Sequence, residues 1–403
     1  MKRFWLALFI CTASCLFPGM VFSADFGLLI DQKIESEQKD SFSYTPGFTP
    51  WLSWNGGRGM SVYLSGLLSM KYNRYGGNME GLSGWVKPLP VPELSRFALN
   101  CRINPGLAFE AGRVRYADVL RFAASGLFDG LRFEALIPVG SLSIGAFYTG
   151  LLYKETAKIV MTAEDSLHFA KPWDWDNFGD YFASRRALAS ARWDMPVGES
   201  GTLSAELLAQ FDLNDAESKR HSQYLGVQLE FYPLSMLRVA LGGVFEAQEN
   251  SDWDFGASFG AAARARMDVP GVASDWLGVT AQFTSGSWND YLILFSPINA
   301  VPQGAVFTGT NAGLALVGAD YSVRIIKSLF AEAALRYFMR TYTEIAADGN
   351  LYGGELWATL AWQPLEDLRA TLGGGVFFPG LGNVYPSGTD VMWKISAAVV
   401  LSL

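Results

Sequence analysis

The pentapeptide Gly256-Ala257-Ser258-Phe259-Gly260 matches G-x-S-x-G, the pattern that exposes a nucleophilic serine at a strand-to-helix turn. That chemistry needs a histidine and an acid close to the serine. Ser258, however, lies inside a segment in which every second residue is Phe, Ala or Met, and both histidines, His168 and His221, fall at or in expected loops. The run Gly373-Gly374-Gly375 has no lysine after it, so it is not a phosphate-binding loop. We therefore do not expect the protein to be an enzyme.

Metal and cofactor sites are not expected either. The chain has 2 histidines and 3 cysteines, and removal of an export segment would leave only Cys101. This is too few for a zinc-type cluster of histidine and cysteine ligands. Carboxylates alone can hold calcium, and the acidic segment 153–183 leaves that alternative open. The sequence predicts no metal and no cofactor.

The composition indicates a large packed or membrane-embedded structure. Of 403 residues, 50% are hydrophobic, 14% aromatic and 17% charged. A typical soluble domain has about 25% charged residues. Disordered chains are rich in charge and poor in aromatic residues, so disorder is excluded. The formal net charge of −8 disfavours binding to nucleic acid, which needs a basic face.

The first 23 residues are predicted to be a signal peptide. Lys2 and Arg3 precede the apolar run Phe4 to Cys11, and Ser23 precedes a plausible cleavage site. An alternative is a lipid-anchor signal that ends at Cys15. Cleavage after Ser23 leaves only Cys101, too few cysteines for an internal disulfide, and in both cases the protein is exported.

The mature chain repeats one pattern, in which every second residue is apolar. It is clearest at the C-terminus, where Trp393, Ile395, Ala397, Val399, Leu401 and Leu403 alternate with residues that are mostly small, polar or charged. Such alternation is typical of a β-strand with one apolar and one wetted face. We find 18 such segments, at 24–35, 47–54, 59–72, 94–103, 106–114, 130–138, 141–152, 184–195, 201–213, 221–232, 236–248, 255–268, 275–285, 312–325, 329–342, 351–362, 367–378 and 391–402.

The connections between these segments alternate between short, turn-rich gaps and longer ones. The longest are 73–93, 115–129, 153–183 and 286–311. Outer-membrane barrels have long loops outside and short turns in the periplasm, and a sheet that spans lipid must close on itself. We therefore predict an all-β fold: residues 24–403 form one transmembrane antiparallel β-barrel in the outer membrane of a diderm bacterium, with both termini periplasmic. We expect 18 strands; 16 is the alternative, because Pro50 and the short second segment could belong to an edge or plug element.

The polar face of each strand should line the lumen, and 18 strands enclose enough space for a water-filled channel. The candidate pore-lining residues are charged and of both signs. They are Arg96, Arg102, Arg132, Glu134, Arg186, Arg192, Glu206, Arg238, Glu246, Arg264, Arg266, Glu332, Arg336, Arg340 and Glu355. These charges could brace one another across neighbouring strands, as Arg186 and Arg192 could with Glu206 and Asp212, or they could form a selectivity constriction. Over the whole inner face, which adds Arg324, Arg369, Glu110, Asp212 and Glu230 to this list, 12 arginines stand against eight acids, and this mixture of signs argues against strong charge selectivity.

Two of the long connections could narrow the pore. The segment 153–183 carries acidic and aromatic residues, and the candidate constriction residues there are Glu164, Asp165, Trp173, Asp174, Trp175 and Asp176. This loop could fold inward or remain outside as a lid, and the sequence does not decide between the two. The stretch from Ala117 to Phe128 is predicted to be a short helix or an inward loop.

The run Gly112 to Asp118, followed by Gly126 to Phe133, resembles a pattern in alginate-export-type and related 18-stranded outer-membrane channels. Those channels use a Gly-Arg strand end, an inward loop and an Asp-Gly-x-Arg strand start, which Arg113, Asp129 and Arg132 match. The resemblance implies passage of a charged or sugar-like solute. The layout also resembles general outer-membrane porins. Their final aromatic residue, part of the signal in the C-terminal strand for the barrel-insertion machinery, is replaced here by Leu403.

The favoured function is a porin-like channel for passive passage of small hydrophilic or mildly charged solutes. The alternative is a surface interaction protein or adhesin with a closed barrel, which would use the loops 153–183 and 286–311. An enzyme or a transporter of apolar solutes is a further alternative, and the latter would need an apolar hatch in the wall. The sequence does not specify the solute, the ion selectivity or the oligomeric state.

Overall fold

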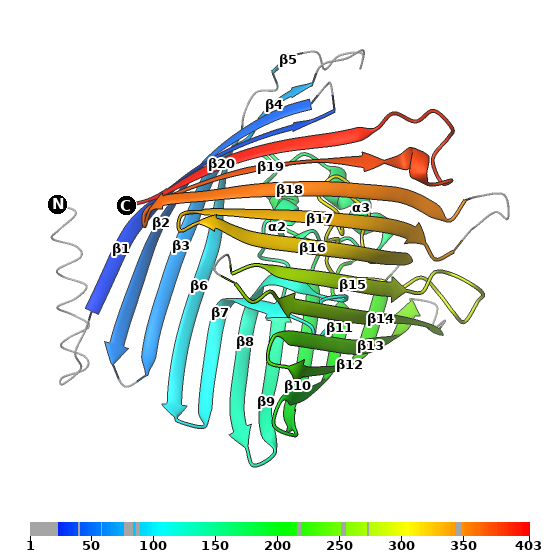
Figure 1. Ribbon diagram of the computed structural model, residues 1–403. Coiled ribbons are helices and arrows are strands. Elements are labelled where there is room, and N and C mark those ends of the chain that lie inside the picture. Colours follow the sequence, from blue (N-terminus) through cyan, green and yellow to red (C-terminus); the bar gives the residue numbers. More distant parts are fainter. Residues whose placement is uncertain are drawn as a thin grey trace.

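The computed structural model describes residues 23–38, 41–57, 59–75, 84–85, 89–215, 219–250, 255–271, 274–342 and 349–403. Residues 1–22 of the predicted signal peptide lie outside the described residues, as does much of the predicted loop 73–93. The described residues form a single antiparallel sheet that closes into a barrel (Figure 1).

Eighteen strands make up the wall of the barrel. They are β1 (Ser23–Glu37), β2 (Ser41–Gly57), β3 (Met60–Met70), β6 (Pro90–Asn104), β7 (Leu107–Ala117), β8 (Ser125–Ile137), β9 (Gly140–Tyr148), β10 (Arg186–Val197), β11 (Gly201–Asp212), β12 (Arg220–Leu234), β13 (Leu237–Asn250), β14 (Phe255–Asp268), β15 (Trp276–Thr284), β16 (Leu314–Ile326), β17 (Leu329–Arg340), β18 (Leu351–Leu365), β19 (Leu368–Phe378) and β20 (Met392–Ser402). Two further short strands, β4 (Tyr72–Tyr75) and β5 (Gly84–Trp85), pair beside β2 at one rim.

Closure is made by the first and last strands. β1 pairs with β20 from Leu29 opposite Ser402 to Glu37 opposite Lys394, and the backbones of Leu28 and Leu403 exchange hydrogen bonds of 2.9 Å. Figure 1 shows β1 and β20 side by side, with the C-terminus beside them. The 18-strand prediction is confirmed.

The sequence left open whether the second segment is a strand of the wall or an edge or plug element. In the structure it is a strand of the wall. β2 pairs with β1 from Ser41 to Asn55 and also pairs with β3, and Pro50 lies opposite Leu28. β7 and β8 extend further than predicted, so that residues 118–124 alone connect them and form no helix. The alternative of an inward loop therefore applies to this connection, as its buried side chains show below.

The wall has the two expected faces. Apolar side chains such as Leu207, Phe245 and Ile395 are exposed on the outer face, where lipid would cover them. Polar and charged side chains lie on the inner face, and many are buried there. They are covered because connections from one end of the barrel fold into the lumen.

Among the described residues, α-helices occur in one of these connections, and a 3-10 turn at Pro379–Leu381 lies in another, between β19 and β20. α2 (Lys154–Ala157) and α3 (Ala163–Ala170) lie between β9 and β10, with a 3-10 turn at Phe178–Tyr181. α3 begins with a capping box, in which the side chains of Thr162 and Asp165 each accept a hydrogen bond from the other's backbone N–H.

Among the described residues, no helix is long and apolar enough to cross a membrane.

The ladder between β6 and β7 is incomplete. The two strands pair from Asn104 opposite Leu107 to Ala98 opposite Gly112, and no further. Gly112 has a φ of 119°, and a Cβ there would lie 2.3 Å from the carbonyl oxygen of Phe97, so only glycine fits.

The side chain of Arg113 crosses the gap beyond this point. Its guanidinium donates to both oxygens of Asp129, at 2.8 and 2.9 Å, to the Leu151 carbonyl at 2.9 Å, and to the Leu94 carbonyl on β6. A side chain therefore replaces the backbone ladder here. Arg113 and Asp129, which matched the channel pattern in the sequence, are the pair that does so.

Replacing Arg113 by methionine should destabilise the barrel. Arg113 is only 4% exposed, and removal of one member of a buried ion pair costs about 3–5 kcal/mol because the other charge is left without a partner. Unfolding by guanidinium chloride in detergent micelles measures the loss. The double variant Arg113→Met/Asp129→Leu should recover part of the lost free energy of unfolding. The variant Arg132→Met, which removes a more exposed ion pair, should lose less free energy of unfolding than Arg113→Met. An equal loss for Arg113→Met and Arg132→Met would contradict this account.

Candidate functional site

The connection 118–124 turns into the lumen around the carboxylate of Asp118. This carboxylate accepts hydrogen bonds of 2.7–3.1 Å from the backbone N–H groups of Leu120, Phe122, Ala123 and Ala124. Burial raises the pKa of Asp118, although these donors favour its charged form. The side chains of Leu120 and Phe122 are buried inside the barrel. Apolar residues thus pack where water would otherwise fill the lumen.

Side chains from two strands of the wall bind this connection. On β11, Glu206 accepts a hydrogen bond from the Tyr116 hydroxyl and another from the backbone N–H of Val119, both at 2.7 Å. On β14, the guanidinium of Arg264 donates to the Leu120 carbonyl at 3.3 Å. Glu206 is therefore occupied by the connection and is only 3% exposed.

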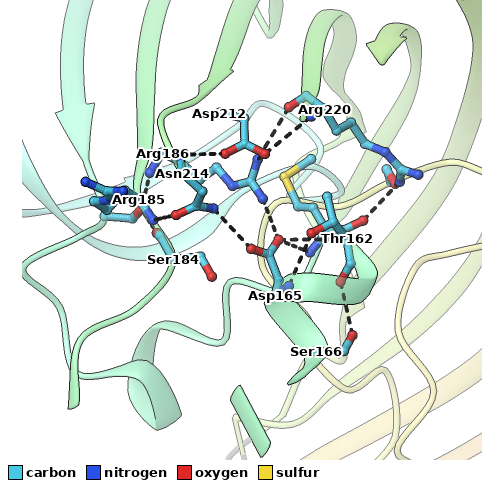
Figure 2. A network of polar contacts seen from close by, with 12 residues as sticks. Thr162, Asp165, Ser166, Ser184, Arg185, Arg186, Asp212, Asn214 and Arg220 are labelled. Atoms are coloured by element: carbon cyan, nitrogen blue, oxygen red, sulfur yellow. Dashed lines mark hydrogen bonds and ion pairs between the residues drawn. The ribbon is translucent and has the colours of Figure 1, made fainter. Parts of the chain in front are cut away.

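The first part of the connection between β9 and β10 also folds inward, and an ion-pair network holds it. We define the tether network as Asp165, Arg186, Asp212, Asn214 and Arg220 (Figure 2). Asp165 comes from α3, and Arg186 on β10 forms ion pairs with both Asp165 and Asp212. The Asn214 amide donates to Asp165 at 3.3 Å.

Arg220 extends the tether network to other parts of the lumen. Its guanidinium donates to the Met161 carbonyl at 3.0 Å and to the Ser296 hydroxyl at 2.6 Å. Met161 lies between α2 and α3, and Ser296 lies on the connection between β15 and β16. The tether network therefore joins two inward connections to the wall.

Asp165 stays charged when it is buried. Burial opposes its charged form, but Arg186 and the N–H groups of Met161 and Thr162 outweigh that effect and lower the pKa of this carboxyl. A carboxylate whose pKa is lower in the folded protein than in the unfolded chain stabilises the fold when the pH is above the unfolded-state pKa. This stabilisation is lost as the pH falls through the folded-state pKa. The tether is therefore fully present at neutral pH and weakens only in acid.

The second part of the same connection forms an aromatic cluster with an exposed edge. Tyr153, Trp173 and Tyr181 are buried against one another, with ring centroids 4.7–6.4 Å apart. Of the candidate constriction residues, Asp165 and Trp173 are thus buried. The others are exposed to solvent: Glu164, Asp174, Trp175 and Asp176.

The connection between β15 and β16, residues 285–313, is held at two places. The carboxylate of Glu246 on β13 accepts from the backbone N–H of Ser296 at 2.9 Å. The carboxylate of Glu355 on β18 accepts from three successive N–H groups, those of Ala305, Val306 and Phe307, at 2.7–2.9 Å. Each wall carboxylate binds a backbone segment instead of facing open water.

The predicted lumen charges therefore fall into two groups. Arg186, Glu206, Glu246 and Glu355 are covered by the inward connections and are at most 3% exposed. The others retain access to solvent on the inner face: Arg96, Arg102, Arg132, Glu134, Arg192, Arg238, Arg264, Arg266, Glu332, Arg336 and Arg340. The expected pairing of Arg186 with Asp212 occurs. Arg192 instead pairs with Asp194 at 2.9 Å, because Glu206 is occupied by the connection 118–124.

A pocket of about 510 Å³, which we call the vestibule, lies between the connection 118–124 and the wall strands. Its lining carries more basic than acidic side chains. The arginines are Arg121, Arg192, Arg238, Arg264 and Arg266, and the acids are Asp118, Glu230 and Asp320. Asp118 is turned toward its own backbone, which leaves the arginines in excess. Arg121, at a loop tip, was missed by the sequence analysis, and Trp276, at the start of β15, was not among the predicted lumen residues.

The residues that resembled catalytic groups have structural partners. Ser258 is fully buried in β14 and donates its hydroxyl hydrogen to Glu246. His221 accepts a hydrogen bond from the backbone N–H of Asp212 at 3.1 Å. Among the residues that the structure describes, no group of three or more His, Cys, Asp or Glu side chains is arranged to hold a metal.

Comparison with known proteins finds likeness in fold only. No protein-family model matches the chain, and no curated protein does. Among solved structures, OccK5 (OpdH) of Pseudomonas aeruginosa is 12% identical, with a TM-score of 0.61 over 94% of this chain and 98% of that one. OpdK of the same organism, solved with vanillate, gives the same four values. OprD of the same organism is 12% identical, with a TM-score of 0.56 over 94% of this chain and 95% of that one. These neighbours are outer-membrane channels of the OprD family.

Replacing Arg186 by glutamine should release the segment from α2 to α3. The substitution leaves Asp165 and Asp212 buried without their cation, at a cost of about 3–5 kcal/mol. Amide hydrogen exchange in residues 154–170 should accelerate by about a hundredfold or more. The neighbouring variant Arg185→Gln is the control, because Arg185 is 46% exposed and its ion-pair partner among the described residues, Asp215, is exposed. Equal exchange in the two variants would show that the tether network does not hold the segment.

Proposed function

We propose that the protein is a passive outer-membrane channel of a Gram-negative bacterium, for small hydrophilic or mildly charged solutes. The observation that carries this proposal is a closed 18-stranded barrel whose lumen is polar and is narrowed, at one end, by connections anchored to the wall. The fold of OprD-family channels over 94% of the chain supports it. In this proposal the short turns and both termini are periplasmic, and β20 is the strand that the insertion machinery recognises.

The proposed channel prefers anions. Counted along the sequence, the lumen carries charges of both signs, but Glu206, Glu246 and Glu355 are bound to backbone N–H groups and are shielded from the pore. Arg192, Arg238 and Arg266 of the vestibule form ion pairs with Asp194, Glu230 and Asp268, but all five arginines keep access to solvent and can bind an anion that enters this part of the lumen. OpdK, solved with vanillate, shows that a neighbour of this fold binds a carboxylate.

A closed barrel that acts through its surface is the second candidate. It is favoured by the packing of the inward connections, which bury Leu120, Phe295 and Ile298 among wall residues in the lumen. It would use the exposed edge of the aromatic cluster at Trp175. Ion conduction separates the two candidates, because a sealed barrel inserts without conducting.

In a planar bilayer with a gradient of potassium chloride, the protein should conduct in steady steps with a reversal potential that indicates chloride preference. The double variant Arg238→Gln/Arg266→Gln should lower the chloride-to-potassium permeability ratio by about twofold or more, because it removes two vestibule charges. Arg115→Gln is the matched control, since Arg115 is exposed on β7 outside the vestibule. An inserted barrel that never conducts would refute the channel. A permeability ratio unchanged by the double variant would refute the role of the vestibule.

A further inference from the structure

Charged side chains gather on the outer face of the wall at one end of β7 to β10. Arg113 and Arg115 on β7 lie opposite Asp129 and Leu127 on β8, and Arg185 directly precedes β10. The other outward positions that the structure describes on these four strands are uncharged. Charge on this part of the outer face is therefore confined to the end that carries the inward connections.

Strand parity shows that these side chains point away from the lumen. Val114 and Phe128, which alternate with them, are buried among the side chains of the lumen. Phe133, which has the parity of Asp129 on β8, is 44% exposed on the lipid face. A charged side chain on the lipid face is costly at the middle of a bilayer and costs little near its interface with water. The charged end of these strands therefore lies at the level of the lipid head groups.

Two of the three arginines are available to an external anion. Arg113 is not, because it is 4% exposed and forms the ion pair with Asp129. Arg115 is exposed and forms no ion pair with the described residues. Arg185 is 46% exposed, and its partner Asp215 is 91% exposed. An exposed pair of this kind contributes little free energy, so a more highly charged anion can replace Asp215.

Arg115 and Arg185 lie at the same height, on the outer two of the four strands. One row across the strands consists of Arg113, Asp129, Tyr148 and Ala187. Arg115 and Arg185 are each two residues beyond this row. Neighbouring strands are about 4.8 Å apart, so the backbones of the two arginines are separated by about 14 Å.

The surface between the two arginines is low. Leu127 lies opposite Arg115, and a Cβ at Gly150 would come within 2.9 Å of Cγ of Arg185. The stem of Arg185 therefore lies over a glycine, beside the hydroxyl group of Tyr148. We call Arg115, Leu127, Tyr148, Gly150 and Arg185 the rim patch.

Arg115 also lies on an edge of β7 that has no strand partner. The ladder with β6 stops at Gly112, so residues 113–117 pair with β8 alone. Arg113 bonds to the Leu94 carbonyl across the first part of the gap, but Arg115 makes no hydrogen bond to the described residues of β6. A molecule bound at Arg115 would cover this edge from outside.

Apolar side chains continue from the rim patch toward the middle of the membrane. Leu131, Phe133 and Ile144 are exposed, and they lie on the same outer face farther along β8 and β9. Two separated cations above an apolar surface fit an anionic lipid, because guanidinium groups bind phosphate through paired hydrogen bonds and acyl chains cover the apolar side chains.

The spacing of the cations selects between the lipids of an outer membrane. Lipid A, the membrane anchor of lipopolysaccharide in the outer leaflet, carries a phosphate at each end of a disaccharide. A phosphatidylglycerol molecule has one phosphate and can engage only one of the two arginines.

We propose that the rim patch binds lipid A, with one phosphate on Arg115 and the other on Arg185. The disaccharide lies over Leu127 and Gly150, and acyl chains run along the apolar side chains below. This inference rests on the proposed outer-membrane channel, with its long connections outside, and adds a lipid-binding site to it.

Native mass spectrometry of the refolded, lipid-free barrel in detergent, titrated with lipid A, tests the proposal. Lipid A with both phosphates should bind more tightly than its monophosphorylated form and than phosphatidylglycerol. The double variant Arg115→Gln/Arg185→Gln should weaken its binding by about tenfold or more, because two charge-assisted contacts are lost. The control is Arg102→Gln/Arg369→Gln, which removes the same charge from exposed positions inside the lumen and should bind lipid A like the unmodified protein.

The single variants test the arrangement of the two phosphates. Arg115→Gln and Arg185→Gln should each bind the two forms of lipid A about equally, since only one phosphate then has a partner. Equal binding of lipid A to the double variant and to the unmodified protein would overturn the site. Tighter binding of phosphatidylglycerol to the unmodified protein would overturn lipid A as the occupant. Conductance of the same preparation is recorded in parallel. A barrel that conducts but does not bind lipid A refutes this inference alone, and a barrel that does not conduct refutes the channel.

Discussion

The constraint on which the rest of the structure depends is that every backbone hydrogen-bonding group inside a membrane must find a partner in the protein. A sheet meets it only by closing, and β1 and β20 do so along nine residue pairs. The ladder between β6 and β7 stops at Ala98 opposite Gly112. There the Arg113 guanidinium bonds to the Leu94 carbonyl and to Asp129. A charged side chain is thus used to satisfy a requirement that backbone groups satisfy elsewhere.

Closure creates a lumen, and the same rule then governs the chain that enters it. The inward connections bring backbone N–H groups into a space with little water, where unpaired donors are costly. Glu206, Glu246 and Glu355 on the wall accept from these groups, and Arg186 neutralises the acids that come with α3. Anchoring the connections therefore consumes acidic side chains. Among the side chains that line the vestibule, accessible arginines then outnumber accessible acids, and in the proposed channel this links the narrowing of the lumen to its anion preference.

The sequence predicted the barrel well because alternation is a local signal that every strand repeats. All 18 strands overlap the predicted segments, and even β2, with Pro50, joins the wall. Which of the lumen charges are buried and which are exposed could not be predicted in this way. Parity places Glu206 and Glu134 on the same inner face, but only the path of the connection 118–124 decides that Glu206 is buried and Glu134 is not. Arg121 was missed because the tip of a loop carries no periodic signal.

The central claim is that acids bound by the inward connections do not contribute to the field of the pore. The reversal potential in a salt gradient tests it directly, when Glu206→Gln and Glu134→Gln are compared with the unmodified protein. The account predicts that Glu134→Gln increases chloride preference, since that side chain is 56% exposed, and that Glu206→Gln leaves the permeability ratio unchanged. An equal shift in the two variants would contradict it, because Glu206 would then face the ions as Glu134 does.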